Sequence, residues 1–174
     1  DVVAKWLRYR GLNVTYIQNI TDIDDEIIRR AADAGRDALE YAHEYDDLFR
    51  ADMQALGNTA VSLYLRATDH IPQVIAQVKK LHDHGHAYLI EGDGWYFDLS
   101  TFPDYGKLSG RTGIAANDAV SRIDDSDKKR NTGDFCLWKL SKPDEPVWQD
   151  GELGDGRPGW HIEDTAITES VFGP

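Results

Sequence analysis

Two short stretches of the 174-residue sequence carry side chains that could take part in chemistry. In NITDIDDE, residues 19–26, the hydroxyl of Thr21 is followed by three closely spaced aspartates. In RPGWHIED, residues 157–164, the indole of Trp160 is followed by an imidazole and two carboxylates. Hydroxyl and carboxylate groups can hold a polar substrate, and imidazole with carboxylate can bind a divalent metal ion. These residue types make both stretches candidates for a binding site.

Each stretch also has a purely structural interpretation. Thr21 or Asp22 could cap the helix expected after them by accepting hydrogen bonds from its first amides. DxDD resembles half of a calcium loop, but it lacks the glycine and the distal glutamate of an EF-hand. In the second stretch the two acids could complement a helix dipole while Trp160 fills the core. His161 and Asp164 would share one helix face, yet two ligands do not make a metal site alone.

The elements around the first stretch follow an α/β order. Apolar residues keep helical spacing over residues 2–7, and Gly11 stands where a helix-ending glycine belongs. The β-branched and aromatic run VTYIQNI, residues 14–20, predicts a buried strand, and a helix with acids in its first turn follows as far as Gly35. Ligands of open α/β sheets bind at the carboxyl ends of strands. This order therefore predicts that Thr21 lies at a ligand-binding edge.

Two later stretches have the apolar spacing of core-facing helices. One of them, residues 68–84, opens at Thr68 and is closed by Gly85. The other, residues 38–56, presents its apolar residues at helical spacing: Leu39, Ala42, Tyr45, Leu48, Phe49, Met53 and Leu56.

A different pattern begins at His86. HAYLI and WYFDL flank EGDG, which predicts a β-hairpin. Residues 100–134 are rich in Gly, Asp and Ser and are expected to be irregular and exposed. FCLWKL, residues 135–140, predicts a strand, and residues 150–159 predict a glycine-rich loop. WHIEDTAI then predicts a helix with acids in its first turn.

The sequence is strongly acidic, with 31 acidic and 19 basic residues and a formal charge of −12. This balance argues against a broad phosphate-binding surface on this part of the protein. Two explanations stay open: a halophilic source, in which dense carboxylates keep surfaces hydrated, or a basic nucleic-acid face elsewhere in a longer chain. The spread of aspartate through every loop favours the halophilic source.

The sequence also predicts a cytoplasmic protein without a membrane segment. The single cysteine, Cys136, excludes an internal disulfide and is expected to be a small buried residue of a strand. No apolar run approaches the roughly 18 residues that span a bilayer, and no signal peptide is recognisable. HDHGH, residues 82–86, spans a helix end and a turn, which favours helix-end roles over a metal cluster.

Six blocks of the sequence together resemble the cysteinyl-tRNA synthetases, class I enzymes that activate cysteine with ATP and pass it to tRNA. They follow one another at suitable intervals over essentially the whole chain: NVTYIQNITDIDDEIIRRA, RATDHIPQVI, HGHAYLIEGDGWYFDL, YGKLSGR, DKKRNTGDFCLWKLSKPDEPVW and GRPGWHIE. The resemblance implies a Rossmann-type (HUP-like) α/β catalytic domain divided by a mixed α+β connective insertion. Residues 1–85 would form its first half, residues 86–148 the insertion, and residues 149–174 the start of its second half.

The resemblance also implies roles for three residues. Thr21 matches a position that helps to hold the cysteine substrate, and Trp160 matches an indole that walls the amino-acid pocket. Asp164 stands where many relatives have a cysteine that binds Zn²⁺, the ion that selects cysteine by accepting its thiolate. Aspartate oxygen can bind zinc too, so two hypotheses stay open: Asp164 as a zinc ligand, or a metal-free pocket in which Asp164 caps the helix or holds the substrate ammonium group. All three side chains are expected around one cavity.

The family's ATP-binding motifs are expected outside this sequence. A HIGH-type motif and a zinc-binding cysteine would precede Asp1, whereas a KMSKS-type loop, His and Glu zinc ligands and an anticodon-binding bundle would follow Pro174. KLSKP, residues 139–143, resembles the lysine loop, but it continues a strand into a proline with two carboxylates behind it, so it is rejected. The sequence is interpreted as an internal fragment that contains no catalytic residue and is inactive alone.

The resemblance implies that the complete enzyme is a cysteine–tRNA ligase. Its substrates and partners would be L-cysteine, ATP with Mg²⁺, and tRNA(Cys), with cysteinyl-adenylate as the intermediate and a monomer as the favoured state. Two alternatives stay open. One is a paralogous ligase of the mycothiol pathway that joins cysteine to an amino-sugar cyclitol, and the other is a truncated, non-catalytic binding module.

Overall fold

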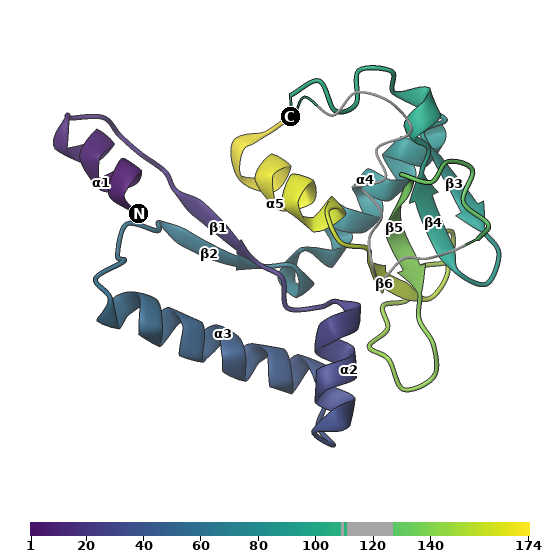
Figure 1. Cartoon of the computed structure of the whole chain (residues 1–174), viewed down its shortest axis with the longest axis horizontal. Helices are drawn as coiled ribbons and strands as arrows, with labels where there is room; N and C mark the ends of the chain where they lie inside the picture. Colours follow the sequence, from purple (N-terminus) through teal and green to yellow (C-terminus); the bar gives the residue numbers. More distant parts are fainter. Residues whose placement is uncertain (109, 111–126) are drawn as a thin grey trace. The chain divides into compact units, whose positions relative to one another are not determined.

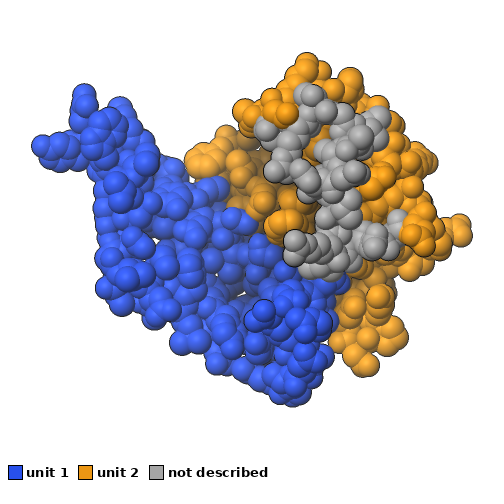
Figure 2. All heavy atoms as spheres, in the orientation of Figure 1, with its two compact units in different colours: residues 1–70 blue, residues 71–174 orange. Residues whose placement is uncertain are grey.

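Residues 1–108, 110 and 127–174 are described by the computed structural model (Figure 1). The chain divides into two units, residues 1–70 and residues 71–174, which Figure 2 colours separately. The middle of the stretch predicted to be irregular, residues 100–134, lies outside the described residues. Its described ends consist of turns, bends and the short 3-10 helix Leu99–Thr101.

Two parallel strands joined through helices form the basis of the first unit (Figure 1). Its main elements are α1 (Val2–Tyr9), β1 (Ile17–Ile20), α2 (Asp25–Asp33), α3 (Ala38–Ala55) and β2 (Leu63–Arg66). In the parallel pair, Ile17 stands opposite Leu63 and Ile20 opposite Arg66. This is the α/β unit that the sequence predicts. β1 is shorter than the predicted 14–20 and only half-buried, because a parallel strand is fully buried only where layers cover both of its faces.

Helix α3 confirms the helix predicted for residues 38–56, but the predicted apolar stripe is buried only in part. Tyr45, Leu48 and Leu56 are 53%, 52% and 72% exposed. The buried positions of α3 are instead spaced four residues apart: Ala38, Ala42 and Asp46. The prediction of a core-facing stripe is therefore wrong for the three exposed residues, because the buried line of α3 consists of small residues and a carboxylate.

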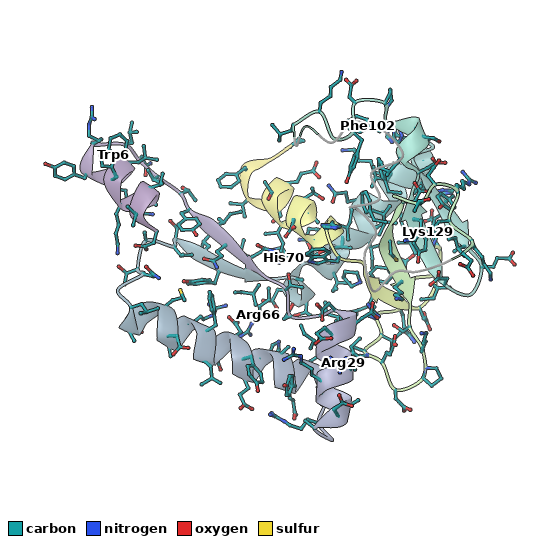
Figure 3. The ribbon with its side chains drawn as sticks, viewed as in Figure 1. Trp6, Arg29, Arg66, His70, Phe102 and Lys129 are labelled. Atoms are coloured by element: carbon teal, nitrogen blue, oxygen red, sulfur yellow. The ribbon has the colours of Figure 1, made fainter. Side chains whose placement is uncertain are left out.

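The carboxylate of Asp46 ties α3 to β2. It accepts hydrogen bonds from Arg50, one turn further along the helix (Nε–Oδ1 2.7 Å), and from Arg66 of β2 (Nε–Oδ2 2.7 Å), which Figure 3 labels. Burial raises the pKa of Asp46, but hydrogen bonds from the two guanidinium groups lower it more, so this pKa lies below its usual value. The guanidinium group of Arg50 also lies over the ring of Tyr64, 4.7 Å from its centroid. The fold thus favours the ionised carboxylate.

We expect the folded state to become less stable in acid, because the contribution of the Asp46 contacts is lost when its carboxylate is protonated. The unfolded pKa of an aspartate is about 3.9, and the folded pKa of Asp46 is lower. The contribution of Asp46 is therefore fully present above the unfolded pKa and is lost as the pH falls through the folded pKa. Asp46→Asn should lower the free energy of unfolding at neutral pH by about 1–3 kcal/mol and weaken its dependence on acid.

Urea unfolding of the wild type and of Asp46→Asn, over a series of pH values from neutral to acidic, measures these effects. The matched control is Asp47→Asn, because the Asp47 side chain is 77% exposed and lies 3.7 Å from Arg66. An exposed ion pair contributes little, so this variant should unfold like the wild type. Equal losses in the two variants would contradict the role given to Asp46.

A four-stranded antiparallel sheet and two helices form the second unit (Figure 1). Its main elements are α4 (Ile71–Asp83), β3 (Ala87–Ile90), β4 (Gly94–Phe97), β5 (Phe135–Leu140), β6 (Gly156–Pro158) and α5 (Ile162–Phe172). The strand order is β3-β4-β5-β6. Val74 and Val78 of α4 pack with Trp138 of β5, and all three are fully buried. These elements confirm the predicted helix over 68–84, the hairpin, the strand over 135–140 and the last helix.

Strand β6 lies inside residues 150–159, where the sequence predicts only a loop. A Cβ atom on Gly156 would stand 2.4 Å from the carbonyl oxygen of Lys139, and one on Gly159 would stand 2.0 Å from that of Cys136. Glycine therefore permits close approach of two backbones here, as it does in strands. The loop prediction is wrong for the residues of β6.

Two smaller predictions concern the cysteine and the histidine-rich stretch. Cys136 is 1% exposed and packs in a small cluster of buried strand residues, as expected. Nδ1 of His84 lies 2.6 Å from the carbonyl oxygen of Lys80 near the end of α4, which agrees with a helix-end role. Among the described residues, no group of three or more His, Cys, Asp or Glu is placed to hold a metal ion. None of the described helices combines the length and the apolar character that crossing a membrane requires.

Candidate functional site

A cavity of about 460 Å³ lies in the first unit, at the carboxyl end of β1. Thr21 lines it together with Asn19, a residue of β1. Arg30 of α2 and the rings of Tyr41 and Tyr45 on α3 also line it. Its size is in the range of small-molecule sites, and this edge is where parallel α/β folds bind their ligands. The cavity therefore combines a hydroxyl, an amide, a cation and aromatic rings at the predicted edge.

The residue that caps α2 is Asp24, rather than Thr21 or Asp22. Oδ1 of Asp24 accepts a hydrogen bond from the amide of Ile27 at 2.6 Å. The capping interpretation is therefore wrong for Thr21 and Asp22. A helix cap does not explain the hydroxyl at the cavity.

Asp22 ties together the carboxyl ends of the two parallel strands. It is 1% exposed, and its Oδ1 accepts a hydrogen bond from the amide of Thr68 at 3.0 Å. The hydroxyl of Thr68 donates to Oδ2, and Nε2 of His43 on α3 lies 3.5 Å from the same oxygen. Sequence reasoning missed this contact, although an aspartate after one parallel strand and a threonine after the next are expected at the same edge.

We expect Asp22→Ala to lower the free energy of unfolding by about 1–3 kcal/mol, because it leaves the partly buried amide of Thr68 without its acceptor. Asp22→Asn should cost less, since its amide oxygen can still accept from Thr68. Urea unfolding of Asp22→Ala, Thr68→Val and the double variant measures the coupling. Two variants that share one contact should cost less together than the sum of their separate effects, so simple additivity would refute the contact.

The second candidate stretch lies between β6 and α5. Trp160 is 57% exposed, so the interpretation that it fills the core is wrong. His161 has a φ angle of 94° and precedes α5 as its N-cap. The prediction that it shares a helix face with Asp164 is therefore wrong. Glu163 and Asp164 do occupy the first turn, where acids complement the helix dipole.

The two acids of α5 differ in their surroundings. Glu163 is 2% exposed, whereas Asp164 lies on the exposed side of the helix. The sequence gives no signal for this difference, because adjacent acids in a first turn are usually both solvated. An exposed carboxylate at Asp164 is accessible to a ligand.

The three predicted site residues lie in different units. Thr21 belongs to residues 1–70, whereas Trp160 and Asp164 belong to residues 71–174. Their meeting around one cavity stays a prediction.

The arrangement of the first unit defines a class of protein. A strand, two helices and a parallel strand, with a cavity at the carboxyl edge, are typical of Rossmann-type α/β proteins. Residues 1–174 also match the family model described as tRNA synthetases class I (C) catalytic domain. The chain therefore belongs to the class I (C) tRNA synthetase catalytic domain family.

Similar proteins extend this result. The cysteine–tRNA ligases of Trichlorobacter lovleyi and Thermoplasma acidophilum are each 47% identical to the chain over 174 residues. That of Desulfitobacterium hafniense is 44% identical over 173 residues. These alignments cover 99–100% of the chain but only 35–38% of the relatives, so the chain spans about a third of their length. The resemblance based on six blocks and the α/β synthetase fold are confirmed.

Proposed function

We propose that the natural polypeptide carrying this chain is a cysteine–tRNA ligase. The observation that carries the proposal is the 47% identity over all 174 residues to proteins with that name. The carboxylate of cysteine would attack the α-phosphorus of ATP, bound with Mg²⁺, and displace pyrophosphate to give cysteinyl-adenylate. A ribose hydroxyl at the 3′ end of tRNA(Cys) would then attack the acyl carbon and displace AMP. None of these comparisons favours the amino-sugar ligase.

The residues of this chain would contribute by positioning the substrate. Chemistry of this kind depends on alignment of reactants and on stabilisation of charge, so no side chain described here needs to act as a nucleophile. Thr21 would hold the cysteine, and its place on the cavity at the end of β1 supports this role. Trp160 would form an apolar wall, and the 57% exposure of this residue supports contact with a ligand.

Zinc is the second part of the proposal. Asp164 is one exposed carboxylate, and the described residues do not supply a set of three ligands around it. These residues do not form a zinc site by themselves. Asp164 is proposed as one ligand in the natural polypeptide, since aspartate oxygen binds zinc.

We expect Thr21→Val to raise the KM for cysteine about tenfold in the natural polypeptide, because it removes one hydrogen bond to the substrate at nearly constant volume. The KM for ATP should not change. Cysteine-dependent exchange of pyrophosphate into ATP measures both constants. Thr59→Val is the matched control, since Thr59 is exposed and does not line the cavity. A wild type without exchange would refute the ligase proposal, whereas an unchanged KM would refute only the role of Thr21.

Removing the Asp164 carboxylate tests the zinc proposal. The wild type should contain roughly one zinc ion per polypeptide, and Asp164→Ala should contain much less, because structural and catalytic zinc sites need three or four ligands. Elemental analysis of the purified natural polypeptide measures the content. Asp155→Ala, at an exposed aspartate before β6, should keep the metal. Equal zinc in the wild type and Asp164→Ala would defeat the ligand role.

A further inference from the structure

An aromatic row runs from the antiparallel sheet to Trp160. The rings of Phe97 on β4 and Phe135 on β5 are stacked, with centroids 5.2 Å apart and planes 12° apart. The ring of His161 meets Phe135 edge-on at 5.7 Å and 79°. The indole of Trp160 lies against His161, with ring centroids 4.1 Å apart. All four residues belong to the second unit. The Phe97–Phe135 and Phe135–His161 centroid distances lie in the range at which aromatic pairs attract, and the Trp160–His161 pair is closer still.

The backbone that leads into the row is fixed against β5. The amide of Gly159 donates a hydrogen bond to the carbonyl oxygen of Leu137 at 2.8 Å. A Cβ atom at Gly159 would stand 2.0 Å from the carbonyl oxygen of Cys136, so only glycine permits this approach. Trp160 follows immediately. The contact of Gly159 therefore fixes where the backbone of Trp160 begins beside the sheet. It does not fix the orientation of the Trp160 side chain.

His161 adopts a backbone conformation that a side chain disfavours. Its φ is 94° and its ψ is −37°, in a region where glycine is the usual residue. Strain of this kind persists only where the surrounding contacts impose it, and it is frequent at functional sites. Glycine at this position would relieve the strain but would remove the imidazole between Phe135 and Trp160. A need for the imidazole between Phe135 and Trp160 would explain why His161, rather than glycine, occupies this strained backbone position.

We propose that Phe135 and His161 are positioning residues for Trp160. They hold the exposed indole in one orientation, so that it is ready to contact the amino-acid substrate. The sheet of the second unit would in this way influence the affinity for cysteine, although Phe135 does not itself touch the substrate. The inference rests on the proposed function, because it takes the cysteine substrate as the ligand of Trp160.

The ring of Phe135 has a further aromatic neighbour. The ring centroid of Tyr105 lies 6.1 Å from that of Phe135 and 6.5 Å from that of Phe97, so the three rings form a cluster. This cluster gives His161 a firm partner, whereas Trp160, at the other end of the row, is 57% exposed. Because Trp160 lies at the exposed end of the row, loss of an inner ring should change the orientation of its indole.

Two variants test the proposal in the natural polypeptide. Phe135→Leu removes a ring but keeps an apolar side chain, and His161→Gly removes the imidazole while allowing the same backbone. Each should raise the KM for cysteine in pyrophosphate exchange by roughly threefold to tenfold, the loss expected for one aromatic pair, and should leave the KM for ATP unchanged. Because His161→Gly adopts this backbone without strain, it keeps the test valid if Phe135→Leu does not fold.

The controls match these changes. Phe102→Leu removes a ring that is 47% exposed and lies outside the row. Asp144→Gly places glycine at the other described non-glycine residue with positive φ, 68°. Neither should alter either KM. An unchanged KM for cysteine in both test variants, or an equal rise in the controls, would overturn the proposal.

A second measurement uses the natural polypeptide without substrate. The indole N–H signal of Trp160 in a two-dimensional NMR spectrum, assigned with Trp160→Phe, reports ring-current shifts from its neighbour. Phe135→Leu and His161→Gly should move this signal, and the two controls should not. If the wild-type natural polypeptide showed no exchange, the ligase proposal would fail, while the NMR result would still decide whether the row orients Trp160. An unmoved signal in both test variants would overturn the positioning role.

Discussion

Close approach of backbones to β5 is the constraint on which the second unit depends. A Cβ atom on Gly94 of β4 would stand 2.4 Å from the carbonyl oxygen of Trp138, and Gly156 and Gly159 meet β5 from the other side with similar or smaller spacing. Real side chains do not tolerate such distances, so any residue other than glycine would push the strands apart. The tight sheet keeps Trp138 fully buried and places Trp160 directly after a fixed backbone contact.

Buried carboxylates have a comparable role in the first unit. Asp22 joins the ends of the two strands through Thr68, and Asp46 joins α3 to β2 through Arg66. A buried carboxylate is costly unless its oxygens are paired, which makes these contacts sensitive to substitution. They are also directional. They therefore fix the geometry around the cavity at Thr21 more narrowly than apolar contacts of the same area would.

Apolar periodicity predicted most of the elements, because it reflects which side of a helix or strand avoids water. It predicted both helices α3 and α4. Tyr45 and Leu48 of α3 are nevertheless exposed. Apolar spacing shows which residues share a helix face, but it does not show whether another element covers that face. Strand β6 was missed because its glycines resemble those of a loop. The burial of Asp22 and Glu163 was missed for another reason. It depends on contacts and packing with residues distant in the sequence, which a local sequence pattern does not indicate.

The candidate site was proposed from the order of the motifs, because the local patterns around its own residues also allowed structural roles. Around Thr21, local reasoning allowed a helix cap, and around Trp160 it allowed a core residue; the structure removes both interpretations. A hydroxyl or an indole acquires a binding role from the backbone that presents it, and that backbone is set by distant elements. Residues without functional groups, such as Gly159, are therefore as necessary to the proposed site as the side chains that would contact the substrate.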